Sequence, residues 1–171
     1  MGKMASTEKT RGTYLPKRVR LLLVGESPPA SGRFFYYGDS SMTRHTARAF
    51  EKAYRVGFGD DPGCRKFLDF FKECGCYLDD LSFEPVDAMP AAERKARLKA
   101  CVPGLSRRIR RLKPEVVVAV LRRVEPLVRE AIAAAGINPV FRALPFPGQH
   151  HQSRYVAGLS RIIKATLPAT K

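Results

Sequence analysis

An acidic residue follows a short apolar run near the start of the chain, where it could take part in catalysis. Residues 19–24 read Val-Arg-Leu-Leu-Leu-Val, and Gly25 and Glu26 follow directly. Such a run is typical of a buried parallel strand that ends in a loop, so the Glu26 carboxylate is expected at the mouth of a sheet. There it could act as a general base or stabilise a developing positive charge. The alternative is that Glu26 only caps a turn.

The loop that follows, residues 26–40, combines a stiff backbone with flat aromatic faces. Pro28 and Pro29 restrict the backbone and remove two N–H donors. Residues 34–37 read Phe-Phe-Tyr-Tyr, and aromatic rings are the surfaces on which an extruded nucleobase stacks. These aromatics could instead fill a hydrophobic core. Because loop residues often carry function, we favour ligand contact.

Two later segments also place polar side chains where strands should end. Asp79 and Asp80 lie in a second short apolar run, and a loop with His150 and His151 follows residues 141–144. An ionised Asp accepts hydrogen bonds, whereas a His can donate one. The alternatives are that the aspartates cap a turn and that the histidines are ordinary exposed loop residues. Neighbouring histidines rarely share one metal and no third ligand is evident, so we predict no metal site.

The cysteine pattern does not indicate a metal or a disulfide framework. A Cys-x-Cys pair followed by a long gap matches no standard zinc spacing. In a reducing compartment disulfides are not expected, so the cysteines are predicted to be free thiols in or near the core. They are Cys64, Cys74, Cys76 and Cys101.

The charge of the chain favours a polyanionic partner. The formal net charge is +15 over 171 residues, and each cation near a phosphate releases counterions when nucleic acid binds. Residues 93–123 contain eleven Lys or Arg but only two acids, which favours phosphate contact over a merely solvated face. The candidates for DNA contact are Arg107, Arg108 and, in the last loop, Arg154.

Neither a membrane nor a secretory pathway is indicated. No apolar run approaches the roughly 20 residues that a bilayer-spanning helix needs. Residues 1–17 lack the apolar segment of a signal peptide, so we expect a cytoplasmic protein that does not bind membranes and is a monomer. Because residues 1–17 are polar and without periodicity, they are predicted to be a flexible basic tail. Residues 18–171 are predicted to form one domain.

Strand and helix patterns alternate along this domain. Pro103 and Gly104 are expected to break a basic stretch into two helices. The alternation predicts a three-layer α/β/α fold with a short, mainly parallel four-stranded sheet. In such sheets a site lies beyond the carboxyl ends of the strands, where loops 26–40, 79–85 and 145–155 should converge. The predicted strands are residues 19–24, 76–81, 115–121 and 141–144, and the predicted helices are residues 41–55, 62–72, 90–101, 105–112, 125–135 and 153–166.

The order of these segments resembles the uracil-DNA glycosylase superfamily. Residues 21–28, Leu-Leu-Leu-Val-Gly-Glu-Ser-Pro, are similar to the first family motif, in which a strand ends in Gly before an acidic or polar residue and a Pro-containing turn. In the family an aromatic that stacks on the flipped base follows, which by order is Phe35 or Tyr36. Residues 77–81 are similar to the family's base-reading strand. The resemblance covers residues 19–163.

Two positions depart from the family pattern. Where the family usually reads uracil with an Asn, this chain has Asp80. An ionised Asp80 could accept the ring N–H of uracil or an exocyclic amine of another base, and a neutral one could also donate. Where many members have a His that stabilises the leaving base, this chain has Phe146, which cannot donate. Either His150 or His151 supplies the donor to the leaving base, or the chemistry differs from the usual family form. By resemblance, the loop that contains these histidines would also enter the duplex.

The resemblance implies a DNA glycosylase of base-excision repair, which flips out uracil or another deaminated or damaged base and hydrolyses its bond to the sugar without a cofactor. The first alternative is a non-catalytic protein of the same fold that binds damaged or abasic DNA. The second is an RNA-binding protein whose basic helices carry the function. The implied catalytic residues are Glu26, His150 and His151, and the implied base-contacting residues are Gly25, Ser27, Pro28, Phe35, Tyr36, Asp80 and Phe146.

Overall fold

The computed structural model describes residues 2–167, with side chains from residue 6 onward. Four strands form one sheet in the order β2-β1-β3-β4, and every neighbouring pair is parallel. The predicted three-layer α/β/α fold is confirmed. Its strands are β1 (Leu21–Gly25), β2 (Cys76–Asp80), β3 (Val116–Val120) and β4 (Val140–Leu144).

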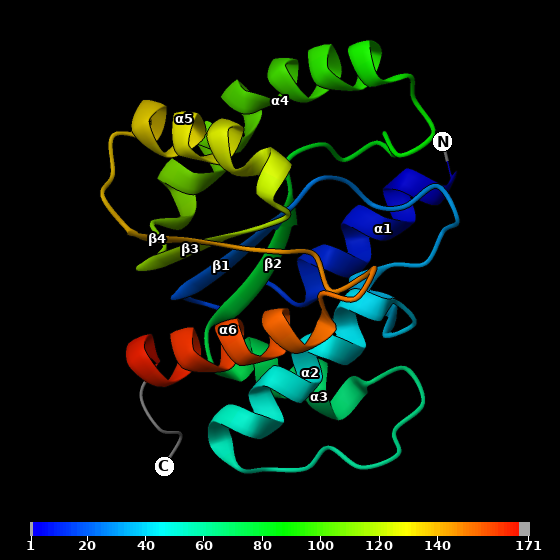
Figure 1. Ribbon diagram of the computed structural model, residues 1–171, viewed down its shortest axis with the longest axis vertical. Coiled ribbons are helices and arrows are strands. Elements are labelled where there is room, and N and C mark those ends of the chain that lie inside the picture. The colour runs from blue at the N-terminus through cyan, green and yellow to red at the C-terminus, as the bar shows by residue number, and fades with distance from the viewer. Residues whose placement is uncertain (1, 168–171) are drawn as a thin grey trace.

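Helices cover both faces of the sheet (Figure 1). The helices α4 and α5 lie on one face, and α2, α3 and α6 lie on the other. Because both faces are covered, β1 and β3 are apolar throughout and almost completely buried. No helix within residues 2–167 has both the length and the apolar character needed to cross a bilayer. The bounds are α2 (Ser41–Tyr54), α3 (Arg65–Glu73), α4 (Ala91–Leu112), α5 (Glu125–Ala135) and α6 (Gln152–Thr166).

Local signals set several helix boundaries as the sequence predicts. The Ser40 hydroxyl accepts a hydrogen bond from the Thr43 amide at 3.0 Å and so caps the start of α2. Gly136 ends α5 with a φ of 69°, a conformation that favours glycine. These boundaries place the loop of residues 26–40 directly between β1 and α2.

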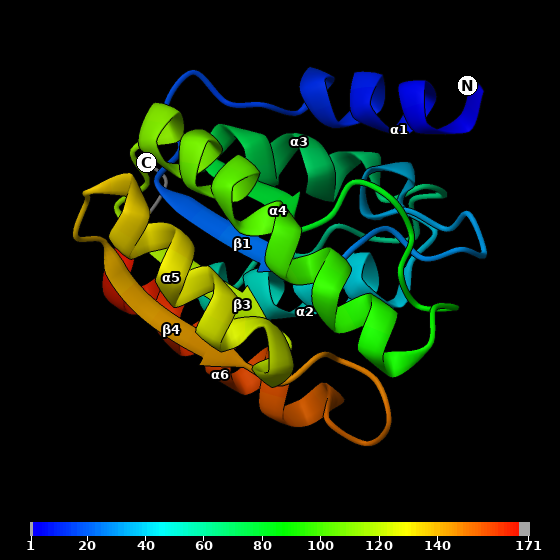
Figure 2. The same cartoon turned by 90° about the horizontal axis from the view of Figure 1, so that it is seen from above.

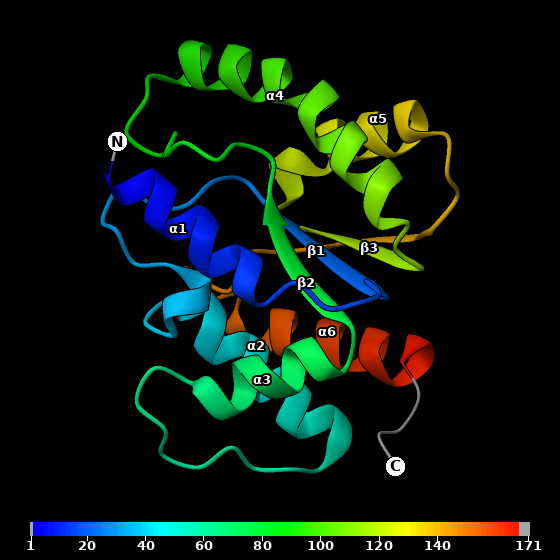
Figure 3. The ribbon, with the colours of Figure 1, turned by 180° about the vertical axis from the view of Figure 1, so that it is seen from behind.

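The predicted break at Pro103 is wrong, because α4 runs through it as one helix. Pro103 removes one amide donor from the helix interior. Apolar side chains on both sides of it, among them Val102 and Leu105, are nevertheless buried in the core. Packing against α5 therefore outweighs the lost hydrogen bond, and the helix changes direction along its length instead of ending (Figures 1 and 3).

The predicted flexible tail is also wrong as a description of its structure, because Gly2–Thr13 forms the helix α1. This helix lies beside β2, the edge strand of the sheet (Figure 3), on the side away from β4 (Figure 2). Its Arg11 is buried, with 2% of the residue exposed. Met1 of the predicted tail and residues 168–171 of the predicted domain lie outside the described residues.

Candidate functional site

A cavity of about 430 Å³ lies at the carboxyl ends of β1, β2 and β3. Its volume is within the range of roughly 300–1,000 Å³ that is usual for small-molecule sites. Gly25, Ser27 and Pro28 line it, as the sequence predicts. The Ser27 hydroxyl accepts the Val86 amide at 3.2 Å, which ties the β1 loop to the segment after β2. The carboxyl ends of the strands therefore carry the candidate site.

The aromatic run divides between the cavity and the core. Phe34 and Phe35 line the cavity, although both are largely buried. Tyr36 is not among the described residues that line it. Its hydroxyl donates to the Leu78 carbonyl at 2.9 Å and accepts from the Leu78 amide at 2.6 Å, and its ring stacks on Tyr14. Of the two predicted stacking residues, only Phe35 lines the cavity. Tyr36 instead binds the backbone of Leu78 at the edge of the sheet.

Glu26 lies between two arginines, and we call Arg94, Glu26 and Arg123 the outer arginine cluster. Arg123 donates through Nε to Oε1 and through Nη2 to Oε2, both at 2.9 Å. Arg94 donates through Nε to Oε1 at 3.0 Å, and its Nη2 also bonds to Oε2. Burial raises the pKa of Glu26, Arg94 opposes that rise, and Asp87 adds to it. Glu26 could accept a proton as a general base only after an arginine turned away.

A second group joins α1, β2 and α4, and we call Arg11, Asp79, Asp80 and Arg108 the inner arginine cluster. Arg11 donates to Asp80 Oδ2 at 2.8 Å and to Asp79 Oδ1 at 3.5 Å. Arg108 donates to Asp79 Oδ2 and to the Asp80 carbonyl, each at 2.7 Å. Both guanidinium groups also lie over the Phe83 ring. Arg11, Asp79 and Asp80 are buried, whereas the Arg108 side chain is 19% exposed. Through Asp80 the cluster connects α1 to the cavity.

Asp80 presents one oxygen that the inner arginine cluster does not use. Its Oδ2 binds Arg11, whereas Oδ1 accepts no hydrogen bond from the described residues and is not fully buried. A Cβ atom on Gly25 would lie 2.4 Å from Oδ1, so the glycine allows the carboxylate to approach β1. Burial raises the pKa of Asp80 and the Arg11 guanidinium opposes the rise. Asp80 ends β2 and lines the cavity, so it does not cap a turn.

The backbone is strained where β3 enters the cavity. Leu121 has a φ of 143°, a conformation that L-residues rarely adopt, and it lines the cavity. It precedes the short helix η2 (Arg122–Val124), which carries Arg123 to the same cavity. Strain of this kind concentrates at functional sites. No pattern in the sequence signals it.

Of the predicted site residues in the loop of residues 145–155, only Phe146 lines the cavity. Phe146 lines the cavity and is 42% exposed. The Ser41 hydroxyl donates to the Pro147 carbonyl at 3.3 Å and connects this loop to α2. His150 and His151 are exposed and do not line the cavity. The structure therefore gives these histidines no place beside a ligand held there.

The predicted DNA-contacting arginines also differ in their surroundings. Arg107 and Arg154 are exposed, whereas Arg108 uses its Nε and Nη2 within the inner arginine cluster and does not line the cavity. The cationic side chains that do line the cavity are Arg33, Arg94 and Arg123.

Sequence reasoning missed Arg11 altogether, and for Arg94 and Arg123 it found only the basic segment that contains them. One signal was present for Arg11. Asp79 and Asp80 stand in a buried strand, and buried carboxylates need cationic partners.

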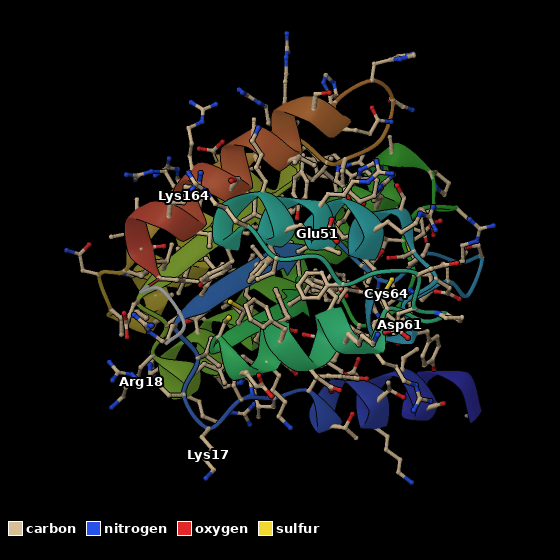
Figure 4. The ribbon with its side chains drawn as sticks, turned by 90° about the horizontal axis from the view of Figure 1, so that it is seen from below. Lys17, Arg18, Glu51, Asp61, Cys64 and Lys164 are labelled. Atoms are coloured by element: carbon tan, nitrogen blue, oxygen red, sulfur yellow. The ribbon has the colours of Figure 1, made fainter. Side chains whose placement is uncertain are left out.

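A second, larger cavity of about 740 Å³ lies at the amino ends of β1 and β2. Its charged lining consists of Lys17, Arg18, Arg20 and Lys72 together with Asp69 and Glu73. Figure 4 shows Lys17 and Arg18 projecting outward from the segment between α1 and β1. Ligand sites of parallel sheets lie at the opposite end, so we place the site in the smaller cavity.

The described part of the chain contains no cluster of potential metal ligands. Between residues 2 and 167, His, Cys, Asp and Glu side chains form no group of three that could hold a metal ion. The four cysteines are free and form no disulfide. Burial raises the pKa of Cys74 and of Cys76, so these thiols are poorly suited to react as thiolates.

The resemblance to uracil-DNA glycosylases rests on short motifs, and of the positions it implies, the cavity contains those on β1, β2 and Phe146 but not Tyr36 or the histidines. A scan against models of protein families finds no match to this chain, and neither does a search of curated proteins, so membership of that superfamily stays a prediction.

Proposed function

We propose that this protein is a DNA glycosylase that takes an extruded nucleobase into the cavity at the carboxyl ends of the strands. The observation that carries the proposal is the pairing of Phe35 with Asp80 in one cavity. A nucleobase has flat faces that stack on an aromatic ring and an edge that forms hydrogen bonds. Phe35 offers the ring, and Asp80 Oδ1 offers a free acceptor.

The free acceptor of Asp80 favours a base with an N–H on the edge that enters the cavity. Uracil has such a group on its ring, as do the purine deamination products hypoxanthine and xanthine. A carboxylate oxygen accepts this hydrogen bond directly. Uracil or another deaminated base is therefore the proposed substrate. The net charge of +15 supports DNA as the polymer that carries it.

Hydrolysis breaks the bond between the sugar C1′ and the base nitrogen. The electron pair leaves with the base, and water adds to C1′ and loses a proton. Glu26 is the proposed carboxylate for stabilising the cationic sugar or accepting that proton. Stabilising the sugar requires only the charge of Glu26, with Arg94 and Arg123 in place, whereas accepting the proton would require one arginine to turn away. Because Phe146 cannot donate a hydrogen bond, the arginines that line the cavity are the candidate donors to the leaving base.

The second candidate is a protein that binds damaged or abasic DNA without cleaving it. The observation that favours it is the state of Glu26, whose two oxygens both accept hydrogen bonds from Arg94 and Arg123. A carboxylate held in this way has both oxygens engaged and its charge offset by the two arginines. The same cavity and the same positive charge would serve binding alone.

A single-turnover assay separates the two candidates. Oligonucleotides with uracil, hypoxanthine, xanthine or an alkylated base, in single and double strands, are mixed with excess protein. We expect cleavage at one or more deaminated bases, and a rate constant about 10²–10⁴-fold lower in Glu26→Gln. Glu84→Gln is the matched control, because Glu84 pairs with Arg97 outside the cavity. DNA binding without any cleavage by the wild type would favour the second candidate.

A further inference from the structure

The two arginines of the outer arginine cluster keep part of their hydrogen-bonding capacity free. Each uses Nε and Nη2 to hold Glu26, and within residues 2–167 neither Nη1 has a partner. A guanidinium has five N–H donors. Each arginine therefore retains both N–H groups of Nη1 for another acceptor.

The charge and the fixed geometry of this cluster suit one anion. Two guanidinium groups and one carboxylate give the cluster itself a net charge of +1, and the other charged side chains that line the cavity are Arg33, Asp80 and Asp87. The arginines come from the start of α4 and from η2, and Glu26 with 9% of its side chain exposed holds both. Donors that are held in place before binding lose little conformational entropy when they bind. Arginine is well suited to phosphate because its donors form a planar fork.

We propose that Arg94 and Arg123 form a binding site for one phosphate group beside the cavity, with Glu26 as the residue that positions them. The inference rests on the proposed function for the source of the phosphate, which is the phosphodiester next to the base in the cavity. Arg94 and Arg123 both line that cavity, so a phosphate bound to them lies next to a bound base. The ligand of the whole site is then a nucleotide within a strand.

The first experiment tests the phosphate site without DNA. Inorganic phosphate is titrated into the full-length protein, and the arginine Nε–H signals are followed by NMR. We expect saturable shifts for Arg94 and Arg123. Arg129 is the matched control, because it also pairs with a glutamate, Glu125, but lies outside the cavity. No saturable shift, or an equal one at Arg129, would overturn the proposal.

The second experiment counts the phosphate contact on DNA. Affinity for a labelled single strand is measured over a series of salt concentrations. The double variant Arg94→Gln with Arg123→Gln should reduce the slope of log affinity against log salt by about 0.7, the change expected when one phosphate contact on a single strand is lost. The control Arg129→Gln should leave the slope unchanged. An unchanged slope in the double variant would overturn the proposal for DNA.

A neutral methylphosphonate linkage beside the target base identifies the phosphate. It should weaken binding to the wild type by about tenfold, as expected for a lost charged hydrogen bond, and have little effect on the double variant. An equal loss in both proteins would contradict the proposal. Failure of the proposed function looks different. If phosphate shifts the arginine signals but no base is cleaved, the glycosylase proposal is contradicted and the phosphate site is supported. If a base is cleaved but phosphate shifts no arginine signal, the phosphate site is contradicted and the glycosylase proposal is supported.

Discussion

The outer and inner arginine clusters use the same chemistry in different surroundings. Each places carboxylates between two arginines from distant parts of the chain. Arg108 of the inner cluster and Arg94 of the outer cluster are similarly exposed, at 19% and 18% of the side chain. The difference lies in the second arginine of each cluster, since the Arg11 side chain is 3% exposed and the Arg123 side chain is 54% exposed. Removing one partner from a buried ion pair leaves an uncompensated charge, whereas an exposed pair contributes little to stability. Burial therefore assigns the inner cluster to holding the fold and leaves the outer cluster open to a ligand.

The largest expected effect is on the inner cluster. Arg11→Gln should lower the free energy of unfolding by about 3–5 kcal/mol, because Asp79 and Asp80 lose a buried cationic partner. Urea denaturation followed by circular dichroism measures it. Glu8→Gln is the control, since Glu8 also pairs with Arg11 but is partly exposed. A loss below about 1 kcal/mol in Arg11→Gln would remove the distinction between the clusters.

The next effect tests how the inner cluster reaches the cavity. Gly25→Ala puts a methyl group where Asp80 Oδ1 lies, so the carboxylate must move. We expect a loss of about 1–3 kcal/mol in unfolding free energy, as for other overpacked core sites. DNA binding or cleavage that depends on Asp80 should fall further than stability does. Full activity in the variant would show that the position of Asp80 Oδ1 is unimportant.

The outer cluster should tolerate the same kind of change that damages the inner one. Arg123→Gln is expected to alter the free energy of unfolding by less than about 1 kcal/mol, because the side chain is largely exposed. The same denaturation assay measures it beside Arg11→Gln. A loss that equals the loss in Arg11→Gln would mean that the outer cluster also holds the fold.

The smallest effect concerns the charge on Glu26. Burial raises its pKa, so NMR of its carboxyl carbon should give a titration midpoint above the ordinary value of 4.5. Arg94→Gln should raise the midpoint further, because a stabilising cation is lost. Asp87→Asn should lower it, because a repelling anion is lost. Shifts in the opposite directions would contradict the electrostatic description of the cluster.

Most of the fold could be predicted from the sequence because its signals are local. The β3 strand has an unbroken run of buried residues, and Gly136 ends α5 where the pattern indicates. Pro103 misled the prediction because its local effect is overridden by packing between α4 and α5. The helix α1 was missed because its sequence lacks apolar periodicity, and its Arg11 is held by partners 68 and 69 residues away.

The location of the site could be predicted more readily than the role of each residue. The β1 motif places Gly25 and Glu26 at the cavity because strand order fixes where strands end. Which hydrogen bonds Tyr36 and Glu26 form depends on tertiary partners, namely the Leu78 backbone and two arginines. Because of those contacts, Tyr36 has a structural role in place of the predicted stacking role. Glu26 belongs to the outer arginine cluster, which the sequence did not predict.

The inner arginine cluster also has a consequence for how the chain folds. Arg11 leaves the ribosome long before Asp79, Asp80 and Arg108. The helix α1 therefore stays undocked and exposed to solvent until β2 and α4 have formed. Contacts across such long separations are slow to form, because closing the intervening loop costs entropy. Docking of α1 is therefore expected late in folding. The helix with Arg11 is the first part of the cluster to be synthesised, yet it is the last to complete the floor of the cavity.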